Sequence, residues 1–227
     1  MDLKLDRLDR ENRGEITKPT FVLCEGKRDA SFILHLMENR GISGIQVGFP
    51  DEITSNTYGS SGFREYLEKL RPRTGFMNIL RRIVILRDRN GNAEKSFQDV
   101  IDQIRAANNY EIPQALEQET TGVPSITIRL IPDTETEGNL DVLLLSAVDP
   151  AHVLNSCSHD YFTCCHLDKM SVGKSAKIKL TTIVAASCQS NPSSSLAFVW
   201  HEDGNPIPLD SPKFNPIADF LRGFSDR

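Results

Sequence analysis

The chain has 227 residues, 39% of them hydrophobic, and a formal net charge of −5 at pH 7. This apolar content is enough for a packed core, and the acidic total gives no general attraction to nucleic acid, although a local basic groove is compatible with it. The first 14 residues carry charges of both signs without the apolar centre of a signal peptide. No apolar run approaches the roughly 20 residues that span a bilayer. Five cysteines, two of them adjacent, indicate reduced thiols, and together these features predict a cytoplasmic protein with no membrane segment.

Between residues 19 and 150, short apolar runs alternate with segments of helical periodicity. Ile83–Leu86 is the clearest buried strand, because three of its four residues are β-branched. The intervening segments repeat apolar residues at the i, i+3, i+4, i+7 spacing of an amphipathic helix. We expect strands at 21–24, 45–49, 83–86 and 126–131, and helices through 32–37, 63–70, 97–104 and 140–148. Strands separated by helices predict an α/β fold with a mainly parallel sheet of about four strands and helices on both faces.

The chain divides into three parts by composition. Residues 1–18 form an N-terminal segment that we expect to be partly disordered, and residues 19–150 form the α/β core. Residues 151–227 are richer in Cys, His, Ser and Lys, and their periodicity is less regular. We expect helices at 174–188 and 214–224, with a loop at 191–195. The third part is therefore predicted to be a mostly helical C-terminal extension that packs on the core.

Acidic residues follow three of the predicted strands. Glu25 follows the first strand, Asp88 follows the third, and Asp141 belongs to an acidic segment after the fourth. The carboxyl ends of parallel strands meet at one edge of a sheet, where α/β proteins usually place their sites. Carboxylate oxygens are the ligands that Mg²⁺ and Mn²⁺ prefer. The sequence therefore predicts a divalent metal site at this edge.

Three segments carry a resemblance to a known family. They are 21–29 (FVLCEGKRD), 83–90 (IVILRDRN) and 138–144 (GNLDVLL). In this order they resemble the Toprim family, the catalytic domain of topoisomerases, bacterial primases and nucleases of the overcoming-lysogenization-defect type. The third segment is similar to one found in small stand-alone Toprim-like bacterial proteins of uncharacterised role. Two positions depart from the pattern, since Asn90 stands where a second Asp is usual and Asp141 where a Glu is usual.

The resemblance implies metal-dependent phosphodiester chemistry with Mg²⁺ or Mn²⁺ as cofactor. Glu25 would act as general acid or base or as a metal ligand, and the other expected ligands are Asp88, Asn90, Asp29 and Asp141. Lys27, Arg87 and Arg89 are candidates for binding phosphate. The two arginines beside Asp88 could instead lower metal affinity by repulsion.

Two functions stay open at this point. The first is a Toprim-like metal-dependent nuclease of phage defence or repair, acting on nucleic acid and working with a separate ATPase. The second is a non-catalytic interaction or nucleic-acid-binding module with a degenerate metal site, which Asn90 favours. A nucleotidyl transferase is a weaker third interpretation, and an oligomer is compatible with either of the first two.

Other motifs carry less chemistry. Gly173-Lys174-Ser175 lacks the upstream glycine of a phosphate loop, because Asp168 occupies that position. The cysteines and histidines between 157 and 166 match no paired zinc-ligand spacing, so we expect buried thiols there in preference to zinc. The basic stretches 69–73 and 81–82 read as solvated faces, and they could form a nucleic-acid groove only if they lie near the acidic edge.

Overall fold

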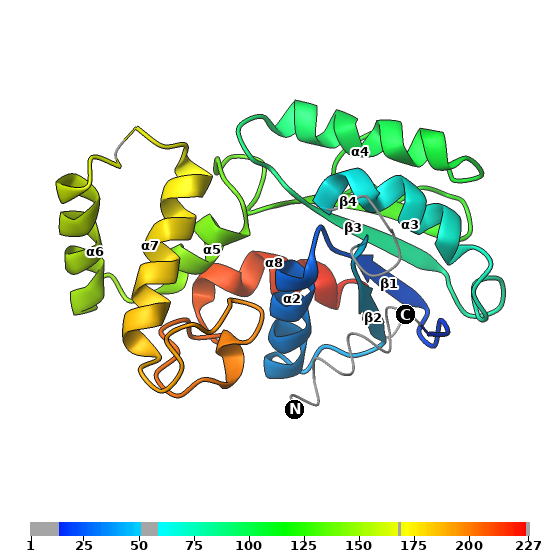
Figure 1. Ribbon diagram of the computed structural model, residues 1–227. Helices are drawn as coiled ribbons and strands as arrows, with labels where there is room; N and C mark the ends of the chain where they lie inside the picture. The colour runs from blue at the N-terminus through cyan, green and yellow to red at the C-terminus, as the bar shows by residue number, and fades with distance from the viewer. Residues whose placement is uncertain (1–13, 51–58, 168, 226–227) are drawn as a thin grey trace.

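The centre of the protein is a four-stranded sheet in which every pair of neighbouring strands is parallel (Figure 1). The computed structural model describes residues 14–50, 59–167 and 169–225. The strand order is β2-β1-β3-β4, so β1 and β3 lie in the middle. Because all four strands run in the same direction, their carboxyl ends share one edge. The strands are β1 (Thr20–Leu23), β2 (Ile45–Gly48), β3 (Arg82–Asp88) and β4 (Ser125–Ile131).

Two helices, α3 (Phe63–Leu70) and α4 (Ala93–Ala107), cover one face of the sheet (Figure 1). Alternate strand residues point to this face, such as Ile83 and Ile85 of β3, and they share a buried cluster with the apolar sides of both helices. This is the side-chain period of two that strand geometry imposes. The spacing of the apolar residues in α3 is therefore explained by its contact with the sheet.

The opposite face is covered by helices from both the core and the C-terminal extension (Figure 1). Val84 and Leu86 point to this side and share one buried cluster with residues of four helices. These helices are α2 (Lys27–Asn39), α5 (Leu140–Ala147), α7 (Val172–Ser187) and α8 (Asn215–Arg222), of which α7 packs on α5. Outside them, α6 (Val153–Cys164) packs against α7.

Short 3₁₀ turns connect the remaining segments. They are η2 (Gly59–Gly62), η3 (Val199–His201) and η4 (Pro212–Phe214). The ring of Phe214 packs edge-on against that of Phe32 on α2, with 5.1 Å between centroids. The hydroxyl of Thr20 donates a hydrogen bond to the carbonyl oxygen of Phe224 at 3.2 Å. The last described residues thus return to the start of β1.

The structure confirms the predicted α/β class, the parallel four-stranded sheet, the helices on both faces and the helical C-terminal part. The largest difference at a strand end concerns β3, which extends to Asp88 and not to Leu86, because Arg87 and Asp88 continue the pairing with Leu130 and Ile131. Residues 1–13 of the predicted N-terminal segment lie outside the described residues. Ile16 is buried, and its N–H donates to the carbonyl of Thr74 at 2.9 Å. Among the described residues, no helix is both long and apolar enough to cross a membrane.

Candidate metal and phosphate site

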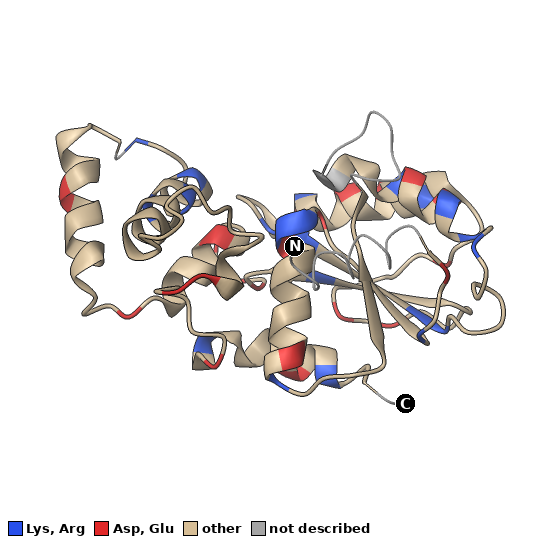
Figure 2. Ribbon diagram, turned by 60° about the horizontal axis from the view of Figure 1, so that its bottom comes forward, with Lys and Arg blue, Asp and Glu red and all other residues tan. Residues whose placement is uncertain are grey.

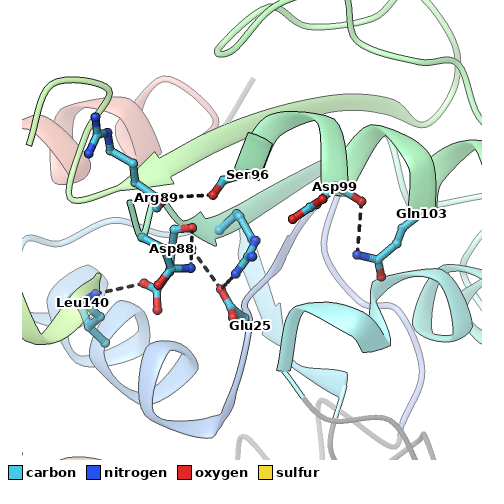
Figure 3. A network of polar contacts seen from close by, with 9 residues as sticks. Glu25, Asp88, Arg89, Ser96, Asp99, Gln103 and Leu140 are labelled. Carbon is cyan, nitrogen blue, oxygen red and sulfur yellow. Dashed lines mark hydrogen bonds and ion pairs between the residues drawn. The ribbon is translucent and has the colours of Figure 1, made fainter. Parts of the chain in front are cut away.

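Glu25 and Asp88 lie side by side at the carboxyl edge of the two central strands (Figure 3). Leu23 of β1 pairs with Ile85 of β3, and this register, continued by two residues, places Glu25 opposite Arg87. Glu25 Oε2 accepts a hydrogen bond from the backbone N–H of Asp88 at 3.0 Å. The same oxygen accepts from Arg87 Nη1 at 2.6 Å. The two predicted site residues are thus joined through one carboxylate oxygen.

Asp88 is connected in turn to the segment that follows β4. Its Oδ1 accepts the N–H of Leu140, the first residue of α5, at 2.9 Å. Asn139 caps this helix, since its side-chain oxygen accepts the N–H of Val142. A carboxylate at a helix N-terminus is favoured by the unpaired N–H groups and by the helix dipole. Residues from three parts of the chain therefore meet around Asp88.

Asp29 and Asp141 complete the acidic group. Asp141 is buried in the first turn of α5, and both Arg28 and Asn139 donate hydrogen bonds to its carboxylate. Asp29 lies in the first turn of α2. Burial raises the pKa of Asp29 to about 7, with the negative charges of Glu25 and Asp141 adding to the effect. All four predicted carboxylates are thus brought to the same place.

The pKa of Asp88 is also raised well above its ordinary value. Burial is the largest cause, followed by the charges of Asp29 and Glu25, while the hydrogen bond from Leu140 and the charge of Arg87 act in the opposite direction. Crowded carboxylates whose pKa values are raised by desolvation and by each other are typical of functional sites. Two guanidinium groups, those of Arg87 and Arg28, pair with Glu25 and Asp141, and the two carboxyls with raised pKa values are the remaining two.

The remaining predicted residues are placed differently. The side chain of Arg89 points away from Glu25 and Asp88, and its Nε donates to the carbonyl of Thr134 at 3.0 Å (Figure 3). Asn90 adopts a left-handed backbone conformation with φ of 53°, and its N–H and carbonyl pair with Gly138. Its side-chain amide nitrogen lies 3.4 Å from the carbonyl oxygen of Asp88. Lys27, partly buried, is the first residue of α2.

The donor chemistry of the site fits Mg²⁺ or Mn²⁺, because four carboxylates supply hard oxygen ligands. Within residues 14–50, 59–167 and 169–225, however, no three His, Cys, Asp or Glu side chains are arranged to hold one ion together. Two of the carboxylates are already engaged, Glu25 with Arg87 and Asp141 with Arg28. Binding of an ion by the set would therefore require these two ion pairs to rearrange.

The prediction of buried thiols between 157 and 166 is wrong. Cys157, Cys164 and Cys165 are exposed, while Cys24 and Cys188 are buried. The reason is that α6 buries only a narrow face, including Phe162, and these three cysteines lie off that face.

The basic stretch 81–82 lies away from the acidic edge. Arg82 is the first residue of β3 and Asp88 its last, so the two lie at opposite ends of the strand. Arg82 pairs with Glu119 and Lys69 pairs with Glu65. Figure 2 shows acidic and basic residues interspersed along the helices. Residues 81–82 therefore do not extend the acidic site into a basic groove.

Two residues of the site were missed from the sequence. Arg28 pairs with Asp141, and Asn139 donates to the same carboxylate while capping α5. The helix-capping preference of Asn, three residues before the run Val142–Leu145, was a signal for the second. No local signal points to the first, because Arg28 and Asp141 are 113 residues apart.

The fold and this arrangement define an α/β protein with a carboxylate-rich site at the carboxyl edge of a parallel sheet. Residues 19–226 match the model of a protein family described as a protein of unknown function, DUF3226. The chain therefore belongs to the DUF3226 family. Comparison with curated proteins and with solved structures gave no match.

Proposed function

We propose that the protein is a Toprim-like nuclease that uses Mg²⁺ or Mn²⁺ to cleave nucleic-acid phosphodiesters. The observation that carries the proposal is the joining of Glu25 and Asp88 at the carboxyl ends of adjacent central strands. The convergence of Asp29 and Asp141 on the same point supports it. These four residues belong to the three segments that resemble the Toprim family.

The roles follow from the placement of each side chain. Asp88, Asp29 and Asp141 are proposed ligands, and Glu25 is either a further ligand or the residue that would hold or transfer a proton. A bound divalent ion would stabilise negative charge that develops on the phosphate. Arg87 and Arg28 form ion pairs with Glu25 and Asp141, so they are the proposed phosphate contacts. Asn90 and Arg89 do not belong to this set, because their side chains donate to main-chain oxygens.

The activity is tested with purified protein, supercoiled plasmid, single-stranded DNA and RNA in Mg²⁺ or Mn²⁺. We expect cleavage of at least one substrate by the wild type, and loss of at least about 100-fold in rate for Glu25→Gln and Asp88→Asn, as for removal of a general acid–base group. Glu94→Gln, an exposed glutamate in the first turn of α4, is the matched control and should cleave like the wild type. Equal cleavage by the wild type and Glu25→Gln, or none by the wild type in either metal, would contradict the proposal. A separate ATPase, added in a second series, is the proposed partner.

One observation favours a second function, a non-catalytic nucleic-acid-binding module. The ion pairs of Arg87 and Arg28 neutralise Glu25 and Asp141 within the protein itself. If they are permanent, the site needs no metal. Calorimetry that detects no Mn²⁺ binding by the wild type, together with retained nucleic-acid binding, would support this alternative.

A further inference from the structure

Arg87 has an incomplete set of hydrogen bonds at the centre of the acidic site. Its side chain is only 9% exposed, and its Nη1 donates to Glu25 Oε2 at 2.6 Å. Its Nε is buried and has no hydrogen-bond partner among the described residues. A buried donor without a partner is uncommon and destabilising in a folded protein. The Nε–H of Arg87 is therefore a buried donor for which an acceptor oxygen is missing among the described residues.

The pairing occupies an oxygen that the proposed reaction needs. Glu25 Oε2 is also the atom that binds the backbone N–H of Asp88. A second arginine repeats the arrangement, since Arg28 pairs with Asp141 and its own Nε is buried and unpartnered among the described residues. A divalent ion held by these carboxylates would stand next to two guanidinium groups. Like charges at such separations repel strongly in a partly buried site.

We propose that Arg87 competes with the divalent ion for Glu25 and acts as an internal counter-cation of this site. In the ion-free protein Arg87 pairs with Glu25. When an ion takes the carboxylates, the guanidinium is released, and its planar set of donors, Nε included, binds the anionic oxygens of a phosphate. Arg28 acts on Asp141 in the same way. This inference rests on the proposed metal-dependent function. It adds that the ion pair of Arg87 with Glu25 opposes binding of the divalent ion.

The competing explanation is a purely structural ion pair. Buried pairs are often broken only at a large cost in stability, because the remaining partner is left charged and unpaired. On that explanation, loss of Arg87 would destabilise the protein and leave its metal affinity unchanged or weaker. Competition predicts the opposite direction for metal affinity. The sign of one measured change therefore separates the two.

The test is calorimetric titration of the full chain with Mn²⁺. We expect Arg87→Gln to bind Mn²⁺ at least about tenfold more tightly than the wild type, a change equivalent to about 1.4 kcal/mol. Arg87→Lys keeps the charge and should stay within about threefold of the wild type. Arg28→Gln, at the more exposed pair, should also bind more tightly, and it tests the inference if Arg87→Gln does not fold.

The matched control is Arg129→Gln. Arg129 is also buried, pairs with a glutamate (Glu117 at 2.7 Å) and has an unpartnered Nε among the described residues, but its partner is not one of the four site carboxylates. Its Mn²⁺ affinity should equal that of the wild type. Equal or weaker Mn²⁺ binding by Arg87→Gln and Arg28→Gln, with clear binding by the wild type, overturns the inference and leaves the proposed function standing. Absence of Mn²⁺ binding in the wild type and in both variants overturns the metal site itself.

Discussion

Replacing Asp29 by Asn should stabilise the protein at neutral and alkaline pH. Burial and the charges of Glu25 and Asp141 raise the pKa of Asp29 from its usual 3.8 to about 7. A raised pKa means that the folded state holds the proton more tightly than the unfolded state. The stability that protonated Asp29 contributes to the folded state is complete below about pH 4. It is lost as the pH rises through about 7. Ionised Asp29 therefore works against folding at pH 8.

The size of the effect follows from the shift. At about 1.4 kcal/mol per pKa unit, the raised pKa of Asp29 lowers stability by about 2 kcal/mol at pH 5, where folding must take up a proton, and by about 4 kcal/mol at pH 8, where the buried carboxylate is ionised. Asparagine keeps the volume and removes the charge, so Asp29→Asn should gain up to these amounts. Asp29→Asn should also remove the repulsion between Asp29 and Asp88, because the charge of Asp29 is one of the causes that raise the pKa of Asp88. This effect is stabilising too.

The assay is urea unfolding at pH 5 and pH 8 in the presence of EDTA, which removes divalent ions that would offset the repulsion. The free energy of unfolding of Asp29→Asn should exceed that of the wild type at both values, by more at pH 8. Asp102→Asn on α4, at an exposed aspartate, is the control and should stay within about 0.5 kcal/mol at both pH values. A variant no more stable than the wild type at pH 8 would refute the proposed crowding of carboxylates.

Two further substitutions test contacts outside the four carboxylates. Gly138→Ala should destabilise the protein by about 1–3 kcal/mol in urea unfolding, because φ at Gly138 is +136° and a Cβ there would lie 2.9 Å from Val142 Cβ. An unchanged unfolding midpoint would contradict this steric account of Gly138. Arg129→Gln should lower stability by about 1–2 kcal/mol by removing the ion pair with Glu117 and the cation–π contact with Phe220, 4.7 Å from the ring centroid. Thermal unfolding measures the change in stability of Arg129→Gln. A loss of stability above about 4 kcal/mol would contradict the assignment of the effect to these two contacts.

Much of the fold could be predicted from the sequence, because local periodicity reports which side of an element is buried. Phe63–Leu70 shows this most clearly, since its apolar spacing alone gave the bounds of α3. The exposed thiols of α6 could not be predicted in this way. A cysteine is apolar enough to suggest burial, and only the packing of α6 on α7 decides which side of the helix is covered.

The candidate site was predictable in location but not in pairing. Parallel strands bring Glu25 and Asp88 to one edge of the sheet whatever the register between them, so the positions of the strand ends alone predict where the site lies. The pairing of Glu25 with Arg87 depends on the register between β1 and β3, which joins residues 62 positions apart. A shift of one residue would have put Asp88 or Leu86 in that place. The left-handed backbone of Asn90 has a local cause, because Asn before Gly favours a turn.

The hydrogen bond between Thr20 and Phe224 has a practical consequence. It holds the end of α8 near the first residue of β1, at the amino edge of the sheet and at the far side from Glu25 and Asp88. The chain therefore reaches Phe224 at the side of the sheet away from the acidic edge. A fluorescent label or a surface anchor for single-molecule work attached beside Phe224 would lie away from Glu25 and Asp88.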